Sequence, residues 1–109
     1  MAVDNTKLLE LVGKTLKEIA PQATGIVYGS RARGDFNVDS DLDILILLPK
    51  SMPKSQQIDL RREIHYKFYD LSVELNYEIE FSPLVLSEET FYERKTPFTI
   101  NVLNEGIRL

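Results

Sequence analysis

The chain has 109 residues, a length typical of one domain, and its 43% hydrophobic and 28% charged residues form an ordinary globular balance. Thirteen Lys and Arg stand against seventeen Asp and Glu, which gives a net charge of −4. A net negative charge argues against a protein whose main function is to bind a nucleic-acid backbone, so we expect no direct nucleic-acid binding.

Cysteine is absent, which excludes disulfides, thiolate nucleophiles and cysteine zinc sites. The single histidine, His65, excludes a site built on two histidines. No apolar run approaches the roughly 18 residues of a membrane span, and the polar segment Met1–Lys7 lacks the apolar core of a signal peptide. We therefore expect a cytoplasmic protein with no membrane partner.

The first half of the chain predicts a helix followed by two strands. Apolar residues recur every three or four positions over 4–20, which predicts a helix capped by Asp4 or Asn5. A short strand is expected at 24–28. A second strand is expected at 41–48, and its second half is apolar on both faces, as at the centre of a covered sheet.

The second half predicts a long helix, a strand and two short helices. Helical spacing of apolar residues covers 54–75, and alternation predicts a strand over 76–86, in which Pro83 marks an edge or a bend. Ser87 begins one short helix and Pro97 opens the last. This order implies an α/β or α+β domain, a small sheet with helices packed on one face.

Several side chains of the long helix are assigned structural roles. Tyr66 and Tyr69 are expected to pack the helix against the sheet. His65 is expected at the surface or half-buried. The cluster 61–63, Arg-Arg-Glu, is expected to form a solvated face.

Paired carboxylates carry the clearest chemical signal. Residues i and i+2 of a strand share a face, so Asp41 and Asp43 point the same way. Their charges repel unless a cation lies between them, and a hard divalent ion such as Mg²⁺ prefers oxygen ligands. Two such ions about 3.5–4 Å apart clamp the two oxygens of a phosphoryl displacement. A third carboxylate, Glu80 or Glu78, would complete the site as ligand or base.

The end of the first predicted strand offers a site for phosphate. Gly29 permits a tight turn and a close backbone approach, and Ser30 offers a hydroxyl and a backbone N–H. Arg31 and Arg33 add positive charge suited to a triphosphate. Nucleotidyl transfer needs phosphate-binding groups at the end of one strand and metal ligands on the next.

Together these residues resemble a known signature. Gly29-Ser30, ten intervening residues and then Asp41-Leu42-Asp43 resemble the signature of the DNA polymerase β-like nucleotidyltransferase superfamily. The runs 29–35, Gly-Ser-Arg-Ala-Arg-Gly-Asp, and 39–45, Asp-Ser-Asp-Leu-Asp-Ile-Leu, are most similar to its minimal nucleotidyltransferase branch. The resemblance covers most of the chain and implies one domain, 1–109, with a small mixed sheet.

The resemblance also implies roles for individual residues. Asp41 and Asp43 match the two metal-binding aspartates, and Gly29 and Ser30 match the pair that holds the nucleotide's phosphates. Glu80 matches best as the third carboxylate, although the family more often has Asp there. Glu78, two residues away, would lie on the same face of a strand, so strand alternation does not distinguish the two acids. The implied cofactor is Mg²⁺, as two ions, and the implied nucleotide is ATP.

Minimal members of this family form two-gene pairs with all-helical proteins of the HEPN type. The implied function is that of an antitoxin, which transfers AMP from ATP to a hydroxyl of the partner. A non-catalytic module that neutralises its partner by binding is an alternative. A small-molecule adenylyltransferase is a third interpretation, and both homo- and hetero-oligomers are compatible with the sequence.

Overall fold

The computed structural model describes residues 4–109. Its elements in chain order are α1 (Asn5–Ile19), β1 (Thr24–Tyr28), α2 (Ser30–Arg33), β2 (Leu42–Leu48), α3 (Lys54–Glu74), β3 (Phe81–Ser87), α4 (Glu88–Glu93), α5 (Pro97–Glu105) and β4 (Ile107–Arg108). No helix within the described range is long and apolar enough to cross a membrane.

The four strands form one mixed sheet in the order β3-β2-β1-β4. β1 pairs antiparallel with both β2 and β4, whereas β2 and β3 are parallel. The predicted fold class, a small mixed sheet with helices, is therefore confirmed. β3 lies at the edge of the sheet, which is where a strand tolerates a proline such as Pro83.

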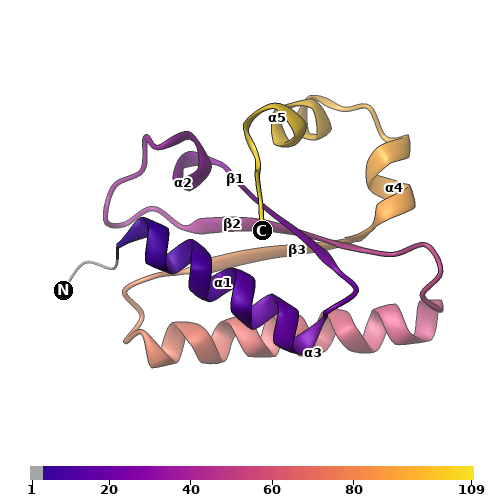
Figure 1. Ribbon diagram of the computed structural model, residues 1–109, viewed down its shortest axis with the longest axis horizontal. Helices are drawn as coiled ribbons and strands as arrows, with labels where there is room; N and C mark the ends of the chain where they lie inside the picture. Colours follow the sequence, from indigo (N-terminus) through magenta and orange to yellow (C-terminus); the bar gives the residue numbers. More distant parts are fainter. Residues whose placement is uncertain (1–3) are drawn as a thin grey trace.

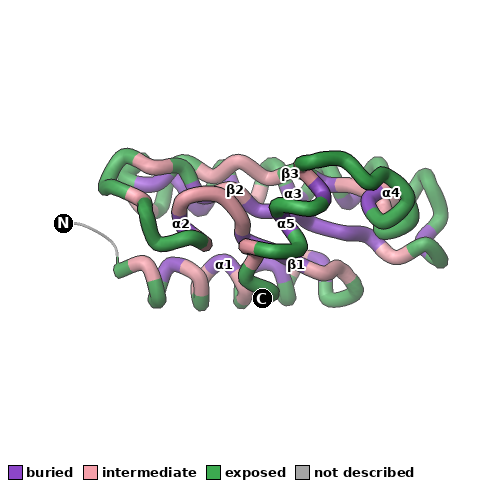
Figure 2. The backbone as a smooth tube through the Cα atoms, turned by 90° about the horizontal axis from the view of Figure 1, so that it is seen from above, coloured by how far each residue is buried: buried purple, intermediate pink, exposed green. Residues whose placement is uncertain are grey.

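Helices lie on both sides of this sheet (Figure 1). The long helices α1 and α3 pack on one face, over Ile44, Ile46 and Leu48 of β2. We expected helices on one face, and the short α4 and α5 add a smaller layer on the other, where Phe91 and Val102 pack with alternate residues of β2. Both faces of β2 are thus covered, which explains its continuous apolar run. Figure 2 shows buried residues along β1 and β2.

Two local predictions were right at the level of individual residues. Asp4 caps α1, since its carboxylate accepts a hydrogen bond from the Thr6 N–H at 2.9 Å. The long helix begins at Lys54 and ends at Glu74, within one residue of its expected bounds.

The strand predicted over 76–86 was wrong in its first half. Asn76 and Tyr77 adopt left-handed conformations with φ of 54° and 58°, so the chain turns at the end of α3 instead of extending. The strand begins only at Phe81. As a result, both candidate third carboxylates precede the strand.

Another prediction that failed concerns the long helix. Tyr66 and Tyr69 do not pack against the sheet, because their exposed fractions are 67% and 59%. Leu60, Ile64 and Phe68 fill that face of α3 instead. His65 is exposed, as expected.

Candidate active site

Gly29 forms the turn between β1 and α2, and its geometry admits no other residue without strain. Its φ of 76° and ψ of −159° lie in a region that is essentially restricted to glycine. A Cβ at this position would lie 2.6 Å from Oδ2 of Asp43, closer than carbon and oxygen approach without a bond. The glycine therefore lets the Asp43 carboxylate lie directly against the turn that begins at Ser30.

Asp43 is held in place by the register of the sheet. It lies opposite Tyr28 in the antiparallel pair of β1 and β2. Alternation places its side chain on the same face as Leu45, the face covered by α4 and α5. Asp41 comes just before β2 and is exposed.

The electrostatics of the site act most clearly on Asp43. Burial raises the pKa of Asp43 above its ordinary value, and the negative charge of Asp41 raises it further. Arg33 opposes both effects. Burial, together with the Asp43 charge, also raises the pKa of Tyr28. The site thus holds negative charge at a place where water only partly solvates it.

A divalent cation fits the Asp41 and Asp43 pair by charge and by donor type. Both groups offer carboxylate oxygens, and a cation between them would offset the Asp41 charge, which adds to the effect of burial on the pKa of Asp43. Within residues 4–109 no three acidic, histidine or cysteine side chains are grouped closely enough to hold a metal. The structure therefore brings two of the three predicted ligands together.

Glu80, the expected third carboxylate, lies immediately before β3 and is exposed. Its backbone carbonyl accepts a hydrogen bond from the Leu42 N–H at 2.9 Å, so the backbone at Glu80 lies beside the start of β2. Glu78 is two residues further back in the turn, where its N–H donates to the carbonyl of Leu75. The choice between the two acids stays a prediction.

Arg31, predicted to bind nucleotide, is only 3% exposed. Its Nε donates to the carbonyl of Ser40 at 3.0 Å, and its terminal nitrogen donates to Oδ1 of Asn5 at 3.2 Å. The guanidinium also stacks over Phe36, 4.9 Å from the ring centroid. Arg31 thus joins α2 to the start of α1 and to the loop that leads to Asp41.

Arg33 is the exposed cation of α2. Its guanidinium donates to Asp35 and to Glu105, each at 3.2 Å, and the second contact joins α2 to α5. It acts electrostatically on Asp43, whose pKa it lowers. The sequence predicted positive charge at Arg33 but no specific role, because spacing alone does not show which arginine of α2 is buried.

Tyr28 is a site neighbour that we did not predict from the sequence. Its ring meets Phe98 of α5 edge to face, with centroids 5.3 Å apart. Only the register of β1 and β2 reveals that it lies opposite Asp43. A tyrosine directly before Gly29 was the available signal.

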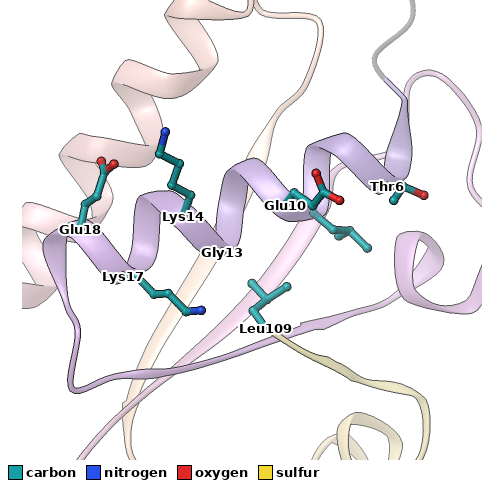
Figure 3. A pocket seen from close by; sticks show the side chains of 8 residues that line it. Thr6, Glu10, Gly13, Lys14, Lys17, Glu18 and Leu109 are labelled. Atoms are coloured by element: carbon teal, nitrogen blue, oxygen red, sulfur yellow. The ribbon is translucent and has the colours of Figure 1, made fainter.

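An open groove elsewhere shows what the candidate site is not. It lies between α1 and the C-terminal Leu109, has a volume of about 720 Å³, and is lined by both acidic and basic side chains (Figure 3). None of the predicted site residues lines it. The paired acids Asp41 and Asp43 lie elsewhere, at the start of β2.

The mixed sheet, the glycine turn and the paired aspartates are the features that the sequence led us to expect of a nucleotidyltransferase. Comparison with known proteins agrees: the chain matches the nucleotidyltransferase domain family over residues 9–109. It belongs to this family, whose members generally use divalent metal ions.

Individual relatives support the same assignment. The chain is 35% identical over 86 residues to the putative protein adenylyltransferase MJ0141 of Methanocaldococcus jannaschii. The match covers 77% of this chain and 75% of the relative. The crystal structure of a putative nucleotidyltransferase aligns with a TM-score of 0.59 and 18% identity, over 93% of this chain and 96% of that one. A second, from Sulfolobus solfataricus, aligns with a TM-score of 0.51 and 21% identity, over 95% and 80%. These two structures confirm the fold.

Proposed function

We propose that this nucleotidyltransferase transfers AMP from ATP to a hydroxyl of a partner protein. The partner would be a helical protein of the HEPN type, and the transfer would make this chain the antitoxin of a cytoplasmic toxin–antitoxin pair. The relative named as a protein adenylyltransferase supports the choice of a protein as acceptor.

The observation that carries the proposal is the contact between Gly29 and Asp43. It brings the turn that would hold phosphates against a carboxylate that would hold a metal, with no side chain between them. A nucleotide bound at this turn would have its phosphates beside Asp43.

We assign roles to the residues on this basis. The backbone N–H and hydroxyl of Ser30 would bind phosphate oxygens, and Arg33, which is exposed, would neutralise part of their charge. Arg31, which we predicted to bind nucleotide, would act from below by holding α2 in place. Asp41, Asp43 and Glu80 would hold Mg²⁺, which supplies electrostatic stabilisation of the transferring phosphoryl group.

The reaction forms a bond from the acceptor oxygen to the α-phosphorus and breaks the bond from that phosphorus to the bridging oxygen of pyrophosphate. Pyrophosphate leaves and the hydroxyl proton passes to a carboxylate, for which Glu80 is our candidate. We choose Glu80 because its backbone lies beside the start of β2, next to the two aspartates.

The test uses the purified chain, α-labelled ATP, Mg²⁺ and a HEPN-type protein encoded beside it. We expect label on that protein, lost in the double variant Asp41→Asn, Asp43→Asn and kept in Glu18→Gln, a control on the opposite face of the sheet. Full transfer by Asp43→Asn would refute the mechanism. If the double variant transfers no label but still neutralises the partner, the chain is a binding module instead.

A further inference from the structure

The long helix α3 has a second apolar face that no other part of residues 4–109 covers. Ile58, Tyr66, Tyr69 and Val73 are all exposed, with Ile58 at 57%. Positions 58, 62, 66, 69 and 73 are spaced by three or four and therefore form one stripe along the helix. An ordinary surface helix is polar on this side, so the stripe calls for an explanation.

Part of this stripe lies in a shallow, open groove of about 690 Å³ on the surface of α3 itself, lined by Ile58, Arg61, Arg62, His65, Tyr66 and Tyr69. Two of these side chains are permanently positive, and none is acidic. The rest of the molecule must therefore carry the excess of negative charge, because the whole chain has a net charge of −4.

The groove leads toward the candidate active site. His65 and Tyr69 also line a second hollow of about 320 Å³, which extends to Tyr77 and Glu80. The backbone at Glu80 is hydrogen-bonded to the start of β2, next to Asp41. A protein lying along α3 would thus end beside the turn that precedes β3.

We propose that this groove docks an acidic amphipathic helix of the acceptor protein. Leucine-like side chains of that helix would contact the tyrosines and Ile58, and its carboxylates would pair with Arg61 and Arg62. Tyrosine and arginine are the residues most enriched among those that dominate binding energy at protein interfaces. The acceptor identity rests on the proposed function, whereas docking itself requires no transfer.

Two other occupants fit less well. A nucleic-acid strand carries a phosphate at every nucleotide, so it would bring negative charge against the exposed acids Asp59, Glu63 and Asp70 as well as against the arginines. An amphipathic helix can instead place its few carboxylates at Arg61 and Arg62, which line the groove, whereas the three acids do not. A second copy that presented its own groove would bring the same two arginines and no carboxylate.

The test follows amide signals of the ¹⁵N-labelled chain, without ATP, during addition of synthetic peptides. One peptide is a helix with leucines spaced by three and four and glutamates beside them, and its match has lysines in place of the glutamates. We expect the glutamate peptide to shift signals of 58–73 and Tyr77, and the lysine peptide to leave them unchanged. The variant Arg61→Glu, Arg62→Glu should weaken the first by at least about tenfold, or roughly 1.4 kcal/mol, while Tyr92→Ala on α4 should not.

The inference is overturned if the glutamate peptide shifts no α3 signal at about 1 mM, or if both peptides bind equally. It is also overturned if single-stranded polyuridine shifts the α3 signals more strongly, or if dilution alone shifts them, which would identify a second copy. Because ATP is absent, failure here leaves the transfer assay unaffected, and loss of transfer in the aspartate variants leaves docking unaffected.

Discussion

Replacing Gly29 by alanine should separate activity from stability at the candidate site. The new Cβ would lie 2.6 Å from Oδ2 of Asp43, so either the carboxylate swings away or the turn between β1 and α2 opens. Both movements separate Asp43 from Ser30. The substitution therefore attacks the contact that supports the proposed function without removing a single functional group.

The expected loss of stability follows from the backbone. Residues held in sparsely populated conformations cost about 1–3 kcal/mol, and φ of 76° with ψ of −159° is such a conformation for alanine. For a domain of this size the cost corresponds to a fall of about 5–15 °C in the unfolding midpoint. The folded variant should still be measurable well below that midpoint.

Gly34→Ala is the matched control. Gly34 also has a left-handed φ, of 92°, but a Cβ there would meet nothing within 4 Å. Circular dichroism should show a lowered midpoint for both variants, whereas labelled-ATP transfer at a temperature where both are folded should fail only for Gly29→Ala. Equal transfer by the two variants would show that the Gly29–Asp43 contact does not matter for activity.

Other substitutions test the charges of the site. The folded-state pKa of Asp43 is raised, so the folded chain binds this proton more tightly than the unfolded one, and stability is lost as pH rises through that pKa. Asp43→Asn should consequently raise the unfolding midpoint at about pH 7, by a margin that shrinks toward about pH 4, in melts at both pH values; a lower midpoint at pH 7 would contradict this. Arg31→Lys loses the guanidinium, which hydrogen-bonds to Ser40 and Asn5 at the same time, and should destabilise the fold by about 2 kcal/mol, measured by urea unfolding. Arg33→Lys should instead leave the urea midpoint nearly unchanged and raise KM for ATP, and the reverse pattern would exchange our two arginine roles. Mg²⁺ at ten times its Kd should stabilise the chain by about 1.4 kcal/mol, an effect absent from Asp41→Asn, Asp43→Asn.

The parts of the fold that the sequence predicted well are those governed by local pattern. The cap at Asp4 and the helix of 54–75 follow from contacts between residues a few positions apart. The position of β2 follows from its apolar run. Each depends on spacing, which the sequence displays directly.

Three features of the structure were not predicted from the sequence, each for a different reason. Burial of Arg31 depends on Asn5 and Ser40, which are 26 and nine residues away, so nothing near Arg31 in the sequence distinguishes it from Arg33. The late start of β3 depends on left-handed residues at the end of α3, and Asn76 is a common residue there but Tyr77 is not. Tyr66 lies two positions from both Ile64 and Phe68, on the other side of the helix, so helical spacing already argued against the packing role assigned to it.

Two features that restrict the choice of residue meet at one point of this molecule. Gly29 adopts a conformation that other residues avoid, and Asp43 is a carboxylate partly desolvated beside Asp41. The carboxylate does not help the chain to fold, because an apolar residue at position 43 would continue β2 without desolvation of a charge or charge repulsion. A bound cation changes this balance, since it would offset the repulsion of the two carboxylates and favour the charged form of Asp43. Burial is the larger cause of the raised pKa of Asp43 and the Asp41 charge the smaller, so a cation would act on the part of the shift that is due to charge.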